Sequence, residues 1–122
     1  MKHLHFDVET AGFYGAYWAC AGGSDCAVIA MIGDDPEDRL ARSAVKWLCG
    51  RGVNVLTMSP AKKDYGHHNY PLERVETAIS WLKANGNHKI GIAGASTTGT
   101  LALTAAAMFP EITLTIAMTP SD

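Results

Sequence analysis

The chain has 122 residues, of which 48% are hydrophobic, and a formal net charge of −2 with a pI near 6.2. This composition suffices for one compact domain with its own core, and the lack of a basic cluster argues against nucleic-acid binding. The amino terminus is charged where a signal peptide would be apolar, and no apolar run reaches the roughly 20 residues that span a bilayer. We therefore expect a cytoplasmic protein with no membrane partner.

The first residues predict an antiparallel hairpin. Residues 3–9 alternate apolar and polar side chains, which is typical of a half-buried strand, and His3 and His5 fall on the face that we expect to be solvated. A turn at residues 10–12 leads into an aromatic-rich strand at residues 13–20.

The next segments alternate between strands and helices. The continuous apolar run Cys26–Ile32 is typical of a strand in a parallel sheet. Asp35 is a suitable N-cap for a following helix. Pro36 supports the same helix start, since proline is favoured at the first helical position. The apolar stripe predicted for this helix comprises Leu40, Ala41, Ala44, Trp47 and Leu48.

The pattern then repeats to the end of the chain. A strand at Val53–Met58, a polar loop, a helix opened by Pro71, a strand from Lys89 and a helix to Phe109 precede a last strand at Ile112–Met118. Strands that alternate with helices indicate a parallel sheet with right-handed crossovers. We predict a single α/β domain over residues 1–122, a three-layer sandwich whose mostly parallel sheet begins with the antiparallel hairpin.

One junction in this pattern carries a candidate nucleophile. Ser96 follows an apolar strand and precedes an apolar helix, with Gly94 two positions before it. This is the layout of a nucleophile elbow, a sharp strand-to-helix turn that exposes a serine in a strained backbone conformation. The usual motif is G-x-S-x-G, whereas here Thr98 takes the place of the second glycine and Gly99 follows it.

Other interpretations of the same run are weaker. Gly94 and Gly99 have the spacing of a phosphate-binding loop, but the lysine that such a loop needs is absent from the next positions. Alternatively, Ser96 only caps a buried helix. Cys20, Cys26 and Cys49 are not placed in an elbow and lack metal-ligand spacing, so we expect buried thiols, no metal and no cofactor.

With these elements and the GIAGASTTG run, the whole chain resembles the N-terminal part of the α/β-hydrolase superfamily. Within it, the run is most similar to the acyl-CoA thioesterase / bile-acid-CoA:amino-acid acyltransferase C-terminal domain family, and dienelactone-hydrolase-like or peptidase-like members are alternatives. The resemblance implies a serine hydrolase acting on a small-molecule ester or thioester. Non-catalytic binding or association is the rival function.

The resemblance also assigns roles by position. It implies that Ser96 is the nucleophile and that the backbone N–H groups of Thr97 and Asp34 form the oxyanion hole. Asp35 is the next candidate donor, where the family usually has a His-Gly motif. Gly94, Asp35, His67 and His68 are possible residues at the edge of the site.

The family carries its catalytic acid and histidine after later strands, and this chain ends near the sixth. We therefore expect a truncated domain without its own acid and histidine, although His67 or His68 could act as the base. The last strand would leave a bare edge, which we expect to be filled by a missing C-terminal half or a second copy. The uncharged helix after Ser96 is predicted to be buried on most sides, so that Leu103→Asp or Ala106→Asp would unfold the domain.

Overall fold

The computed structural model describes residues 3–32, 35–58, 72–95 and 97–118. Its described strands form one six-stranded sheet in the order β1-β2-β4-β3-β5-β6. The strands are β1 (Leu4–Phe6), β2 (Gly15–Trp18), β3 (Cys26–Met31), β4 (Asn54–Met58), β5 (Lys89–Ala95) and β6 (Ile112–Met118). β1 and β2 form an antiparallel pair, β2 is antiparallel to β4, and the other neighbours are parallel. The predicted sheet and its hairpin are thus confirmed.

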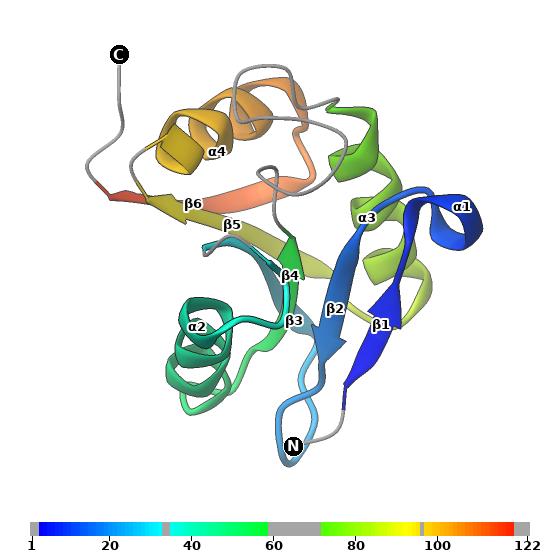
Figure 1. Ribbon diagram of the computed structural model, residues 1–122, viewed down its shortest axis with the longest axis vertical. Coiled ribbons are helices and arrows are strands. Elements are labelled where there is room, and N and C mark those ends of the chain that lie inside the picture. The colour runs from blue at the N-terminus through cyan, green and yellow to red at the C-terminus, as the bar shows by residue number, and fades with distance from the viewer. Residues whose placement is uncertain (1–2, 33–34, 59–71, 96, 119–122) are drawn as a thin grey trace.

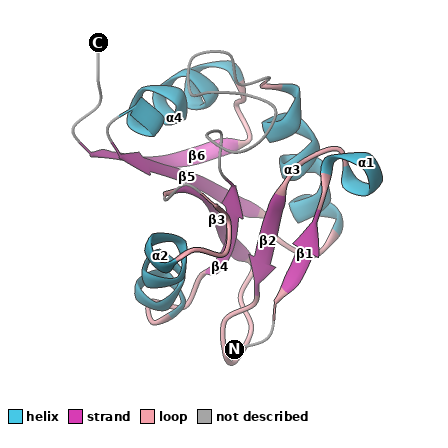
Figure 2. Cartoon of the chain, viewed as in Figure 1, coloured by secondary structure: helices cyan, strands magenta, loops and turns pink. Residues whose placement is uncertain are grey.

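Helices lie on both faces of this sheet. They are α1 (Val8–Ala11), α2 (Arg39–Cys49), α3 (Glu73–Ala84) and α4 (Thr97–Met108). Figure 1 shows α2 on one side of the sheet, with α3 and α4 on the other. The same view coloured by secondary structure shows the layers of a three-layer sandwich (Figure 2).

The sheet therefore has two separate cores. Beneath α3 and α4, the larger core joins both helices to the sheet through Val75, Leu82, Ala102 and other buried side chains, including Ile29. On the opposite face, Val45 and Leu48 of α2 belong to a smaller core with residues of β2, β3 and β4. Apolar side chains on successive strands serve both cores because neighbouring residues of a strand point to opposite faces.

The start of the chain differs from the predicted strand. β1 ends at Phe6, and residues Val8–Ala11 form a short helix instead of continuing the alternation. Asp7 caps this helix, since its Oδ1 accepts hydrogen bonds from the backbone N–H and the hydroxyl of Thr10, at 2.9 and 2.8 Å. Asp is favoured at N-caps, and this local bond competes with the strand.

The start and the buried face of α2 also differ from expectation. The N-cap is Asp38 rather than Asp35, because the carboxylate of Asp38 accepts the backbone N–H of Ala41 at 2.9 Å. The buried residues are Ala41, Val45 and Leu48, whereas Leu40 and Trp47 are exposed. The predicted stripe was thus wrong at these two positions, because the helix packs mainly against β4 and β3 and its Leu40–Trp47 flank extends past them.

The helix after Ser96 is less buried than its uncharged sequence suggested. Ala102 and Ala105 are fully buried against the sheet, but Leu103 and Met108 are about half exposed, at 48% and 57%. The prediction that α4 is buried on most sides was therefore wrong for this chain. Lack of charge permits burial but does not supply a neighbouring layer, and the described elements pack against only one side of α4.

Candidate active site

The central strands β3 and β5 create a switch point in the topology. From β3 the chain crosses to β4 on one side, whereas from β5 it crosses to β6 on the other. β3 and β5 are themselves parallel neighbours, with Met31 paired to Gly94. In open α/β sheets, ligands bind in the crevice outside the carboxyl ends of the strands at such a point.

The segment between β5 and α4 lies at this edge. β5 ends at Ala95 and α4 begins at Thr97, so that Ser96 is the single residue between the two elements in the sequence. The amino end of α4 carries unpaired backbone N–H groups and the positive end of the helix dipole, which favour a negative charge nearby. The conformation of Ser96 lies outside the described residues, so the strained turn stays a prediction.

The connection from β3 to α2 also starts at this edge, and Asp35 in it is held by several hydrogen bonds. The carboxylate of Asp35 accepts from the Tyr14 hydroxyl at 3.2 Å and from the backbone N–H of Glu37 at 3.0 Å. The backbone N–H of Asp35 donates to the carboxylate of Asp38 at 3.1 Å. That N–H is thus already engaged, which weakens Asp35 as an oxyanion donor. Asp34, the first candidate, lies outside the described residues.

Tyr14, the residue directly before β2, is the side chain whose hydroxyl donates to Asp35 in this connection. Partial burial, and then the negative charge of Asp35, raise the pKa of the Tyr14 hydroxyl. The hydroxyl therefore stays protonated and able to donate to Asp35 at neutral pH.

A buried threonine of β4 also holds the β3–α2 connection in place. Thr57 of β4 is fully buried, and its hydroxyl donates to the carbonyl oxygen of Pro36 at 2.6 Å. The indole N–H of Trp18 donates in turn to the Thr57 hydroxyl at 3.3 Å. Since the hydroxyl is satisfied in both directions, Thr57 ties the β3–α2 connection to the centre of the sheet.

A cluster that the sequence did not reveal lies beside this connection. The Nε2 atom of His3 contacts one carboxylate oxygen of Glu37, and the Nδ1 atom of His5 lies 3.4 Å from the other. The His3 ring stacks on Trp18 with centroids 4.0 Å apart. The expected solvation of His3 was thus wrong, because its partner Glu37 lies 34 positions away in the sequence and no local pattern links them.

Several predicted site residues lie outside the described parts of the chain, namely Ser96, Asp34, His67 and His68. The structure brings Gly94, Asp35 and the amino end of α4 to one edge of the sheet, but it does not test a catalytic triad. The candidate base and acid therefore stay predictions.

The cysteines lie away from this edge or are unsuited to nucleophilic chemistry. Burial raises the pKa of the Cys49 thiol, so its thiolate form is scarce at neutral pH. Across the described ranges, no group of three or more His, Cys, Asp and Glu side chains is placed to hold a metal ion. Of the helices that the structure describes, none has the length and apolar character to cross a bilayer.

Comparisons with known proteins add to this geometry. No family model and no curated protein matches the sequence. Among solved structures, the Pyrococcus furiosus esterase Pf2001 superposes with a TM-score of 0.72 at 22% identity, over 98% of this chain and 48% of that one. The α/β hydrolase GrgF from Penicillium sp. sh18 gives 0.75 at 22% identity, over 98% and 45%.

A third structure agrees with these two. Est1E from Butyrivibrio proteoclasticus has a TM-score of 0.72 at 20% identity, over 98% of this chain and 51% of its own. The chain thus spans about half the length of the structures it resembles. Together with the sheet order and the two helical layers, these likenesses show that the chain has the fold of α/β hydrolases over about half of their length.

Proposed function

We propose that this chain is part of a serine hydrolase that cleaves a small-molecule ester or thioester, with Ser96 as the nucleophile. The observation that carries the proposal is the position of Ser96 in the sequence, between the end of β5 and the start of α4 at the switch point of the sheet. Of the matched structures, Pf2001 is named an esterase and GrgF an α/β hydrolase, which supports the reaction class.

The chemistry would follow the acyl-enzyme route. The Ser96 hydroxyl loses its proton to a base and attacks the carbonyl carbon, and the negative oxygen is held by the backbone N–H groups of Thr97 and Asp34. The alcohol or thiol leaves with a proton, and water then releases the acid. Thr97 begins α4, so its N–H points out of the first helical turn, as such a donor requires.

The catalytic base and acid that Ser96 requires would come from polypeptide other than this chain. A serine hydroxyl stays protonated at neutral pH unless a base takes its proton. The matched hydrolases are about twice as long as this chain, so we propose that the remaining half, or a second copy, supplies these groups. His67 or His68 is the alternative base within the chain.

The second candidate function is non-catalytic association. One observation favours it: the exposed apolar side chains of α2, α4 and β6 offer surface for a partner.

A fluorophosphonate probe distinguishes the two functions. It labels an activated serine, so we expect labelling of the protein as expressed in its native cells, at a peptide that contains Ser96. Ser96→Ala should abolish the label and lower turnover of a p-nitrophenyl ester by several orders of magnitude, with little change in melting temperature. Comparing that ester with a thioester of the same acyl group then tests the thioesterase assignment. An unlabelled, folded protein would favour the non-catalytic function.

A further inference from the structure

Two of the three cysteines of the chain lie close together where β2 and α2 end. Cys49 is the last residue of α2, and its Sγ atom lies 4.0 Å from the carbonyl oxygen of Trp18, the last residue of β2. Cys20 follows Trp18 by two positions. Since two residues of extended chain span at most about 7 Å, Cys20 lies near the Cys49 sulfur.

Both cysteine side chains belong to the face of the sheet that carries α2. Trp18 is part of the core beneath α2, and Cys49 packs against that core. Residues two apart on an extended chain point to the same side, so the Cys20 side chain is directed to the side of Cys49. Cys20 is buried and Cys49 is partly buried.

The electrostatics of Cys49 agree with this placement. Burial raises the pKa of the Cys49 thiol, and the neighbouring Cys20 raises it further. Two like groups affect each other in this way when they lie close together. Because the thiolate is the reactive form, the raised pKa also means that Cys49 reacts slowly at neutral pH.

Backbone hydrogen bonds hold both residues in place. The N–H of Cys20 donates to Asn54 Oδ1 at 2.9 Å, and its carbonyl oxygen accepts from the N–H of Gly23 at 3.2 Å. The carbonyl oxygen of Cys49 accepts from the N–H of Gly52 at 3.1 Å. These bonds keep the two residues side by side, which a disulfide requires because its α-carbons are usually about 4.4–6.8 Å apart.

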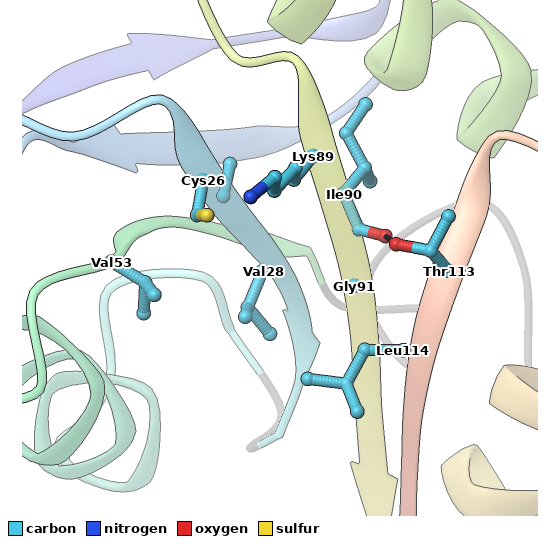
Figure 3. Close-up of a pocket in the computed structure, with 9 residues that line it drawn as sticks. Cys26, Val28, Val53, Lys89, Ile90, Gly91, Thr113 and Leu114 are labelled. Carbon is cyan, nitrogen blue, oxygen red and sulfur yellow. Dashed lines mark hydrogen bonds between the residues drawn. The ribbon is translucent and has the colours of Figure 1, made fainter.

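The third cysteine lies apart from this pair. Ala27 pairs with Asn54 in the register of β3 and β4, so Cys26 lies beside Val53. β4 separates β3 from β2, and two strand spacings amount to about 10 Å, which is more than a disulfide spans. Figure 3 shows Cys26 between Val53 and Lys89, where it lines a hollow of about 180 Å³. Cys26 is therefore a control thiol within the same chain.

We propose that Cys20 and Cys49 form a reversible disulfide when the protein meets a small-molecule disulfide, for which oxidised glutathione is the probe. The bond would clamp the end of α2 to the end of β2. The segment that it encloses contains β3, α2 and the connection between them, in which Asp35 lies. The proposal rests on the fold and not on the catalytic role of Ser96.

The reaction is a two-step thiol–disulfide exchange. The thiolate of Cys49, the less buried of the two, attacks one sulfur of oxidised glutathione, whose S–S bond breaks and releases one glutathione thiolate. The thiolate of Cys20 then attacks the Cys49 sulfur of the mixed disulfide, and the second glutathione thiolate leaves. The two protein thiols lose their protons to solvent, the two glutathione thiolates take up protons, and two electrons pass from the protein to oxidised glutathione.

Peptide mapping tests the pairing directly. The folded, reduced protein is incubated with mixtures of reduced and oxidised glutathione, free thiols are then blocked with N-ethylmaleimide, and the digest is analysed by mass spectrometry. We expect a disulfide-linked pair of peptides that contain Cys20 and Cys49, in a monomer on a non-reducing gel. Cys26 should stay outside this bond.

Matched variants separate the roles of the three thiols. Cys26→Ala should form the bond like the wild type. Cys20→Ala should stop at the mixed disulfide of Cys49 with glutathione, and Cys49→Ala should form no internal bond. Circular dichroism should show all three variants folded, since each loses one small side chain.

Thermal unfolding measures the effect of the bond. The bond between positions 20 and 49 closes a loop of about 30 residues and so restricts the unfolded chain. Oxidation should therefore raise the melting temperature of the wild type and of Cys26→Ala by at least about 5 °C, and a reductant should reverse the rise. Cys49→Ala treated in the same way should show no rise.

Four results would overturn the proposal: Cys20 and Cys49 both blocked by N-ethylmaleimide at every glutathione ratio, a bond that includes Cys26, a bond between two chains, or a bond that forms only in urea. A Cys20–Cys49 bond that lowers the melting temperature would also overturn it, because the native positions would then not fit a disulfide. Ser96→Ala should form the bond like the wild type. Lost serine labelling with a retained disulfide would therefore count against the proposed function alone.

Discussion

Asn87 and Asn54 join several segments at the amino edge of the sheet through buried hydrogen bonds. The side-chain amide of Asn54 donates to Asn87 Oδ1 at 2.9 Å, and its oxygen accepts the backbone N–H of Cys20, also at 2.9 Å. The Asn87 amide donates to the Tyr17 hydroxyl and to the Leu82 carbonyl, both at 3.2 Å. These bonds hold β2, β4 and the end of α3 together at a place where neither asparagine has solvent to replace a lost partner.

Asn87→Ala should therefore lower the free energy of unfolding by about 1–3 kcal/mol, because it removes the acceptor of a buried N–H of the Asn54 side-chain amide. Urea denaturation followed by circular dichroism measures the change. Ser80→Ala, on the exposed face of α3, is the control and should have little effect. Equal stability of Asn87→Ala and the wild type would show that water reaches this network.

The raised pKa of Tyr14 should make the folded protein less stable at alkaline pH. Its folded pKa is raised above the ordinary value of 10.0 by burial and by Asp35. The unfolded tyrosine thus ionises first, so its contribution to stability is complete below pH 10.0 and falls as the pH rises through the folded pKa. Urea midpoints between roughly pH 8 and 11 should fall less steeply for Tyr14→Phe than for the wild type. Parallel curves for the two proteins would exclude this coupling.

Within helix α4, two residues differ in burial and should therefore differ in their tolerance of a charge. Ala105 is fully buried against the sheet and Leu103 is half exposed. An unpaired charge in the core costs several kcal/mol, which is comparable to the whole free energy of unfolding of a small domain. Ala105→Asp should therefore prevent folding, whereas Leu103→Asp should remain folded, contrary to the expectation from sequence.

The comparison requires expression of both variants under the same conditions, followed by circular dichroism and urea denaturation. Leu103→Asp should change stability by less than about 1 kcal/mol, as is usual for exposed positions. An unfolded Leu103→Asp would mean that polypeptide outside the described residues covers this side of α4.

In the whole molecule, the strand order predicts how stability is distributed. β3 lies between β4 and β5, so its backbone groups bond on both sides, whereas β6 ends the described sheet. Amide hydrogen exchange should be slowest in β3 and faster by about tenfold or more in β6, because edge strands open locally at lower cost. Nuclear magnetic resonance resolves this strand by strand. Equal protection of β6 would indicate that its outer edge is paired in solution.

Local sequence determined much of this architecture. Alternating strand and helix signals predicted the layers, because hydrophobic periodicity and turn residues act over short distances. The position of Ser96 between β5 and α4 also followed from local pattern, namely an apolar strand, a glycine-rich turn and an apolar helix. Its role as a nucleophile remains a prediction.

Only the tertiary structure decided which faces are buried and which distant residues meet. Leu40, Trp47 and Leu103 have the composition of core residues, yet they are exposed because the described elements pack against only part of α2 and only one side of α4. The contact of His3 with Glu37 joins residues whose separation no periodicity can encode. Burial and long-range pairing depend on how whole elements pack, so they could not be predicted from local pattern alone.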